Sequence, residues 1–372
     1  MRELRQIIAA FESLCREQRA AALATVVRVD GSAYRRPGAR MLIAADGQTW
    51  GGVSGGCLER DVARLGRQLI AEPDSPAMIR WYETTEEDAF DASQPGPSLG
   101  CGGAIQILIE RVTADCPGPL ATIARVLHER KPAHIATLIS TGASSPRRWI
   151  HFDDQWLSRY ADTPYSPVIE NALAEMSQST QHLRLEDGPE TLDVLLERIA
   201  PPQSLVIFGD GSDVRPVVEL AKMLGWHISL VSRQSEDGLR NRFPGIDAIY
   251  SDDRASIVLT TDAAVLVMTH NVRRDAAALR LAVSQNCAYV GALGPKRRTQ
   301  RLLQSLPGLD SQKVFAPVGL DIGAESSEEI ALAAIAEIQS VLKNRPAGRL
   351  SDRSGPIHVP TPSLRIPAGR PA

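Results

Sequence analysis

Residues 204–211 read Ser204-Leu-Val-Ile-Phe-Gly-Asp-Gly211. The first five form a short, continuous and mostly apolar run, which is typical of a parallel strand buried on both faces. The glycine turn that follows leads into a helical pattern from residue 213. Apolar strands and helices then alternate up to residue 343, which indicates a parallel sheet covered by helices. We therefore predict a doubly wound α/β domain over residues 201–343.

The turn over residues 209–212 stands where a dinucleotide-binding fingerprint has its glycines. The match is incomplete, because Val214 takes the third glycine position and Ser232 ends the next strand where an acidic ribose acceptor is expected. A carboxylate at Asp210 would repel a pyrophosphate. Three interpretations stay open: NAD binding, a purely structural turn, and binding of another phosphate-bearing ligand.

A second candidate group follows the predicted strand Ala263 to Met268. His270 and Asn271 come directly after it, at the carboxyl end of a parallel strand, which is the edge where ligands bind in open α/β sheets. A lone histidine is more often structural than functional. The polar character of this loop makes His270 a candidate ligand-binding residue.

The first 145 residues mix helices with strands and predict an α+β domain. Two β-like runs, Arg40 to Ala45 and Gln48 to Gly51, flank Asp46-Gly47, a strong two-residue hairpin signal. Residues 146–200 give mixed signals, and we interpret them as a connecting region. Residues 344–372 hold six prolines and little apolar periodicity, so we expect a disordered tail.

Two cysteines lie in glycine-rich loops, at Cys57 and Cys101. Glycine lets a ligand approach the main chain closely, so a thiol held between glycines can meet a bulky partner. Gly55, Gly56 and Cys57 would lie at the start of a helix over residues 58–71, where the helix dipole favours anions and the thiolate form of cysteine. The alternative is that both cysteines are small buried hydrophobes in tight turns.

Composition excludes several classes of function. A formal net charge of -3 gives no electrostatic reason to expect nucleic acid or an anionic membrane as partner. The chain has no apolar run long enough for a membrane span and no secretory leader, so we expect a cytoplasmic protein. Five cysteines, an odd number without a Cys-x-x-Cys pair, fit free thiols in a reducing compartment and argue against a structural zinc site.

Several motifs together resemble the XdhC/CoxI family of accessory proteins, over residues 1–112 and 203–343. The motifs are Gly31-Ser-Ala-Tyr-Arg-Arg-Pro-Gly-Ala-Arg-Met41, Gly52-Val-Ser-Gly-Gly-Cys-Leu-Glu59, Leu99-Gly-Cys-Gly-Gly103, Thr269-His-Asn271, Tyr289-Val-Gly-Ala-Leu-Gly294 and Pro317-Val-Gly-Leu-Asp-Ile-Gly-Ala-Glu325. The resemblance implies an N-terminal XdhC/CoxI-type domain and a Rossmann-like C-terminal domain. It also implies a maturation chaperone, with little turnover of its own, for molybdenum hydroxylases such as xanthine dehydrogenase.

Such a protein is expected to carry the molybdenum cofactor, as molybdopterin or its dinucleotide, while a cysteine desulfurase supplies the sulfido ligand, and to deliver it to the apoenzyme. We expect Cys57, with Cys101 as second choice, to lie near the molybdenum, and the ligand to lie between the two domains. The remaining candidate cofactor-binding residues are Arg36, Arg40, Gly55, Gly56, Glu59, Gly209, Gly211, Ser212, His270 and Asn271.

The sequence departs from the family pattern at Asp210, Ser212 and Ser232, which weakens the phosphate-binding interpretation of that turn. Two alternatives therefore stay open. One is an NAD(P)-dependent oxidoreductase, favoured by the predicted sheet. The other is a scaffold that recruits the desulfurase and the client without touching the cofactor. A homodimer is expected in either case.

Overall fold

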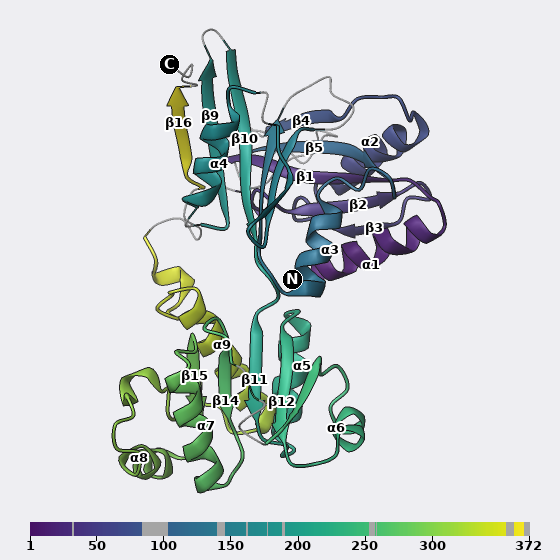
Figure 1. The fold of residues 1–372 in the computed structure, drawn as a ribbon. Helices are drawn as coiled ribbons and strands as arrows, with labels where there is room; N and C mark the ends of the chain where they lie inside the picture. Colours follow the sequence, from purple (N-terminus) through teal and green to yellow (C-terminus); the bar gives the residue numbers. More distant parts are fainter. Residues whose placement is uncertain are drawn as a thin grey trace. The chain divides into compact units, whose positions relative to one another are not determined.

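The computed structural model describes residues 1–31, 33–83, 103–139, 146–160, 163–176, 178–187, 190–252, 257 and 259–354, and 361–367. The chain divides into two compact units (Figure 1). Unit 1 contains Met1–Arg2 and Pro202–Ser354, and unit 2 contains Glu3–Pro201 and Gly355–Ala372. Within the described ranges, no helix is both long and apolar enough to cross a membrane.

Unit 1 is built on a five-stranded parallel sheet with the order β13-β12-β11-β14-β15. The central strand β11 is buried along its whole length, as its apolar sequence predicts. The chain reverses direction across the sheet between β11 and β14, which makes their carboxyl ends the topological switch point. The elements are β11 (Ser204–Phe208), α5 (Val214–Met223), β12 (His227–Ser232), α6 (Glu236–Arg242), β13 (Ala248–Ser251), β14 (Ala264–Val267), α7 (Val272–Ser284), β15 (Tyr289–Ala292), α8 (Lys296–Gln304), η2 (Ser311–Lys313), α9 (Ser327–Leu342) and η3 (Leu350–Asp352).

Apolar cores cover both faces of this sheet. One contains α5 and α9, and the other contains α7 and α8. Local caps define several helix ends: Asn271 accepts hydrogen bonds from two amides at the start of α7, and Ser326 forms a capping box with Glu329 at the start of α9. The predicted doubly wound Rossmann-like fold is confirmed for this part of the chain.

Unit 2 contains two sheets. The first is antiparallel, with the order β3-β2-β1-β5-β4, and the second has the order β16-β9-β10-β6-β7-β8. The predicted hairpin at Asp46-Gly47 is present between β2 and β3. The elements are α1 (Arg2–Arg16), β1 (Ala21–Asp30), β2 (Arg40–Ala44), β3 (Thr49–Gly51), α2 (Glu59–Ala71), β4 (Met78–Glu83), β5 (Ala104–Val112), α3 (Leu120–Glu129), β6 (Ala133–Ile139), β7 (Arg148–Phe152), β8 (Gln155–Ser158), α4 (Ser166–Ala174), β9 (Thr180–Asp187), β10 (Glu190–Ile199) and β16 (Ser363–Pro367).

Strand β1 is buried on both faces because each face of its sheet is covered. Helix α2 packs on one face, where it forms a core with Ala22, Ala24 and Val26. Residues Ala21 and Leu23 point to the opposite face and join a core that contains α1, α3 and residues of the second sheet. The alternation of side chains along one strand therefore holds three layers together.

Residues 146–200 and the C-terminal residues differ from the expectation. The segment that we interpreted as a connection supplies β7, β8, α4, β9 and β10 of the second sheet. Residues 363–367, within the expected disordered tail, form β16, which pairs in parallel with β9 (Figure 1). The high proline content of residues 344–372 does not exclude a strand, because an edge strand tolerates proline at its ends, as at Pro362 and Pro367.

Two buried ion pairs join the sheets of unit 2. Arg40 on β2 pairs with Glu197 on β10 at 2.7 Å, and both side chains are 2% exposed. Glu110 on β5 pairs with Arg148 on β7 at 2.5 Å, with side chains 2% and 7% exposed. The first sheet supplies the cation of one pair and the anion of the other. A buried charge is tolerated only when it is paired, so these contacts require the two sheets to meet in one alignment.

We expect Glu197→Gln to lower the free energy of unfolding of unit 2 by about 3 to 5 kcal/mol, because it leaves the Arg40 guanidinium buried without a counter-charge. Urea unfolding followed by tryptophan fluorescence measures this, since Trp50, Trp81, Trp149 and Trp156 lie in this unit.

The matched control is Glu129→Gln, which removes the exposed partner of Arg125 and should change stability far less. The double variant Arg40→Met with Glu197→Leu should regain most of the loss, because it removes both charges together. A double variant as unstable as Glu197→Gln would contradict this account.

Candidate functional site

The first candidate site is the loop between β3 and α2, residues 52–58, which we call the cysteine loop. Cys57 lies directly before the residue that precedes α2, and its side chain is exposed. This outcome excludes the alternative in which Cys57 is a small buried hydrophobe. Cys101 lies outside the described residues, so its predicted role stays a prediction.

Ser54 and Glu59 hold the cysteine loop in shape. The Ser54 hydroxyl donates a hydrogen bond to Glu59 Oε2 at 2.5 Å, while Glu59 Oε1 accepts the amides of Val53 at 3.2 Å and Ser54 at 2.8 Å. Burial raises the pKa of Glu59, but these hydrogen bonds outweigh burial and lower the pKa below its ordinary value of 4.5. Glu59 therefore has the contacts that a loop-orienting role requires.

The same hydroxyl oxygen organises the donors around Cys57. It accepts the amides of Gly56 at 3.2 Å and Leu58 at 3.1 Å, and the Cys57 thiol donates to it with Sγ and Oγ 3.4 Å apart. The amides on both sides of Cys57 are thus already satisfied inside the loop. These two amides are therefore not available to an anion that approaches the sulfur.

The space beside the thiol is open. Gly56 has a φ of +118°, which a residue with a side chain rarely adopts, and a Cβ there would meet no atom within 4 Å. A Cβ at Gly55 would lie 3.2 Å from the ring of Tyr34, which is itself 78% exposed. A large ligand can therefore approach Cys57 over the glycines, with the Tyr34 ring as a flat neighbour.

Arg36 and Arg40 are two of the predicted cofactor-binding residues. Arg40 is buried, and Glu197 neutralises its guanidinium. Arg40 therefore joins the two sheets, and its guanidinium is not available to a ligand. Arg36 is partly exposed in the loop between β1 and β2. In the described ranges, no group of three or more histidine, cysteine or acidic side chains is arranged to hold a metal ion.

The second candidate site is the carboxyl edge of the sheet in unit 1. Gly209 has a φ of +142°, and a Cβ there would lie 2.4 Å from the carbonyl oxygen of Met268, so the backbones of β11 and β14 approach closely only because this residue is glycine. Gly211 lies beside the His270 ring, which a Cβ at that glycine would approach to 3.5 Å. Ser212 is exposed. The structure therefore brings the predicted turn and His270 to one edge.

The carboxylates of this edge already have partners. The Asp213 carboxylate is hydrogen-bonded to His270 Nε2 at 2.8 Å and makes no capping bond to α5, although it stands at the N-cap position directly before that helix. The Ser232 hydroxyl donates to the Asp210 carboxylate. Asn271 caps α7, so its oxygen accepts the amides of Arg273 and Arg274. The edge is polar but carries negative charge where a pyrophosphate would lie.

Sequence reasoning missed Ser54, Tyr34 and the Asp213 contact. Ser54 stands four residues before Leu58, and serine before a helix is a capping residue type, which was the available signal. The contact between Asp213 and His270 depends on two strands that lie side by side in space, and no local pattern shows it. The expected ligand site between the two units stays a prediction.

The structure defines a class of two-unit protein, in which a Rossmann unit is joined to a second α+β unit that carries an exposed loop cysteine. Similarity to known proteins shows the family. Residues 205–338 match the XdhC Rossmann domain, and residues 14–81 match the XdhC and CoxI family. A probable xanthine dehydrogenase subunit of Bacillus subtilis (strain 168) is 30% identical over 337 residues, 88% of this chain and 95% of that protein. The chain belongs to the XdhC and CoxI family.

Two further similarities agree with this assignment. The molybdenum cofactor insertion chaperone PaoD of Escherichia coli (strain K12) is 25% identical over 326 residues, 86% of this chain and 83% of that protein. The crystal structure of a xanthine dehydrogenase from Bacillus halodurans matches with a TM-score of 0.73 and 27% identity, over 94% of this chain and 98% of that chain.

We expect Glu59→Ala to raise the alkylation rate of Cys57 severalfold, because the loop loses the acceptor that orders Ser54 and, through it, the thiol. Peptide mapping by mass spectrometry after timed iodoacetamide treatment measures the rate. Cys116, also exposed, is the internal control and should react equally in both proteins. An unchanged Cys57 rate would remove Glu59 from this role.

The ionised form of Glu59 accepts these hydrogen bonds, so its ordering effect is complete above its ordinary pKa of 4.5 and is lost as the pH falls through the lowered value of the folded state. The amide NMR signals of Val53 and Ser54 should titrate with a midpoint below 4.5. A midpoint above that value would contradict the hydrogen-bond assignment.

We expect no saturable binding of NADH or NADPH at micromolar concentrations, because the Asp210 carboxylate lies where the pyrophosphate would need positive potential. Fluorescence titration of the purified protein tests this. Micromolar binding of either nucleotide would support the oxidoreductase interpretation instead.

Proposed function

We propose that this protein binds the molybdenum cofactor as cargo, protects it while a cysteine desulfurase supplies its sulfido ligand, and delivers it to an apoenzyme of the xanthine dehydrogenase type. The protein itself does not turn over a substrate. The single observation that carries the proposal is the exposed Cys57 sulfur, held by Ser54 in a loop with open space over Gly56.

The chemistry of this loop suits a soft metal that arrives with ligands of its own. A thiolate is a soft ligand, and molybdenum in its cofactor is already held by two dithiolene sulfurs. Since no group of three or more histidine, cysteine or acidic side chains in the described residues is arranged to hold a metal ion, a free metal ion would find too few ligands beside Cys57. A preassembled metal cofactor needs only one contact from the protein.

The hydrogen bond from the Cys57 thiol to Ser54 gives the sulfur a defined partner when it binds no metal. The Ser54 proton is directed to Glu59, so in the empty loop the thiol is the donor of the pair. If the Cys57 sulfur bound a metal as a thiolate, its proton would pass to solvent and the donation to Ser54 would end, while the bonds between Ser54 and Glu59 would remain. Such a contact can form and be released repeatedly, as delivery of cargo requires.

The names of the relatives support the same proposal. One is a molybdenum cofactor insertion chaperone and another a probable xanthine dehydrogenase subunit. We further propose that His270 and the turn over residues 209–212 serve the cargo or the client. Their polar groups end at the switch point of the sheet, where ligands bind in this architecture.

We expect protein that is co-expressed with a molybdopterin-producing host to carry molybdenum and pterin, and Cys57→Ala to lower the molybdenum content at least about tenfold, equivalent to about 1.4 kcal/mol. Elemental analysis gives the metal, and pterin fluorescence after oxidation gives the organic part.

Cys116→Ala, at another exposed cysteine, is the matched control and should load like the wild type. Cys101→Ala tests the second-choice sulfur in the same assay. An empty wild-type protein that still matures its client would favour the scaffold alternative, and equal loading of Cys57→Ala would exclude Cys57 as the metal contact.

A further inference from the structure

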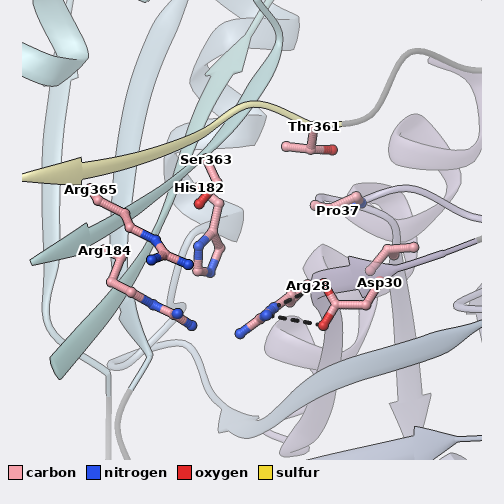
Figure 2. A pocket seen from close by; sticks show the side chains of 9 residues that line it. Arg28, Asp30, Pro37, His182, Arg184, Thr361, Ser363 and Arg365 are labelled. Carbon is pink, nitrogen blue, oxygen red and sulfur yellow. Dashed lines mark hydrogen bonds and ion pairs between the residues drawn. The ribbon is translucent and has the colours of Figure 1, made fainter.

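A pocket of about 230 Å³ lies in unit 2, and none of the candidate cofactor-binding residues of the sequence analysis lines it (Figure 2). Three arginines line it, Arg28 near the end of β1, Arg184 on β9 and Arg365 on β16, and His182 on β9 lines it as well. We call it the arginine pocket. Its volume exceeds what one water molecule needs, so it can admit a polyatomic ligand.

Strand pairing places the arginines together. In the parallel ladder, Arg365 stands opposite Arg184 and Ser363 stands opposite His182, so their side chains share one face (Figure 2). Like charges directly opposite each other destabilise a pair of strands. The sheet therefore holds two guanidinium groups in a position that is favourable only when negative charge is supplied.

The protein supplies part of that charge. Arg28 pairs with Asp30 at 3.0 Å, and Arg184 pairs with Asp193 at 3.0 Å. The Arg365 side chain makes no ion pair or hydrogen bond with the part of the chain that the structure describes, and it is exposed. Among the described residues, three cations against two carboxylates leave one positive charge without a partner.

His182 provides an independent observation. The residue is 7% exposed, and its Nε2 has no hydrogen-bond partner among the described residues. Burial lowers its pKa; Arg28 and Arg184 lower it further, and Asp193 and Asp30 act in the opposite direction. The ring is therefore neutral at pH 7 and holds a buried polar atom that is costly to leave unpaired.

We propose that the arginine pocket binds a phosphoryl group, either of inorganic phosphate or of a phosphate monoester. Guanidinium groups bind phosphate oxygens through paired, charge-assisted hydrogen bonds, and three such groups converge here. A phosphoryl oxygen that reaches His182 would also satisfy its Nε2. Strand β16 closes the pocket, since it supplies both Ser363 and Arg365.

One loop borders both this pocket and the cysteine loop. Pro37 lines the arginine pocket, and Tyr34, three residues earlier, lies against Gly55 beside Cys57. A phosphoryl ligand can therefore influence the cysteine loop through this short segment. The phosphoryl site does not depend on the proposed function, because it requires neither molybdenum nor Cys57.

Isothermal titration of the full-length, cargo-free protein with inorganic phosphate tests the proposal, at an ionic strength fixed with chloride. We expect saturable binding at millimolar or lower concentrations, weakened roughly tenfold in Arg365→Gln because one charge-assisted contact is lost. Ser363→Asp should abolish binding, since it cancels the unpaired positive charge. Circular dichroism checks that both variants fold.

Arg16→Gln, at an exposed arginine on α1 outside the pocket, is the matched control and should bind like the wild type. No binding by the wild type, or an affinity of Arg365→Gln equal to that of Arg16→Gln, would overturn the proposal. Repeating the titration with cargo-loaded protein separates the two sources: lost phosphate binding assigns the phosphoryl group to the cargo, and retained binding assigns it to a separate ligand.

Discussion

The two buried arginine–glutamate pairs between the sheets of unit 2 are the constraint on which both the cysteine loop and the arginine pocket depend. Each pair takes its cation from a different sheet, so a slip of either sheet by one residue would bury four unpaired charges. The cysteine loop follows β3, which pairs with β2, and the arginine pocket lies where β1 meets β9. The Nε atoms of both Arg40 and Arg148 have no partner among the described residues. The pairs therefore specify an alignment more than they add stability.

Much of the fold could be predicted because its signals are local. An apolar run followed by a glycine turn predicted β11 and the sheet around it, and Asp46-Gly47 predicted the hairpin of β2 and β3. The exposure of Cys57 followed from its glycine neighbours in the same way. The strands within residues 146–200 and β16 were missed, because their pairing partners are distant in sequence and their own patterns are weak.

Charged residues were the hardest to interpret from sequence. Arg40 has the same surroundings in the sequence as a ligand-binding arginine, and only the position of Glu197 on a distant strand shows that it supports the core. Arg28, Arg184 and Arg365 carry no motif, yet strand pairing brings them to one pocket. In unit 1, Asp210 and Asp213 are engaged by Ser232 and His270, so an edge that resembles a phosphate site holds its own anions.

The place of β16 in the chain has a consequence for how the protein is made. A growing polypeptide folds from its N-terminus as it leaves the ribosome. The second sheet of unit 2 can gain β16 only after the whole of residues 202–354 has been translated. Until then β9 is an edge strand that is unpaired on its outer side, and His182 and Arg184 lack the neighbouring strand that carries Ser363 and Arg365. A nascent chain interrupted at any point before residue 363 would thus lack the arginine pocket, although its cysteine loop could already be formed.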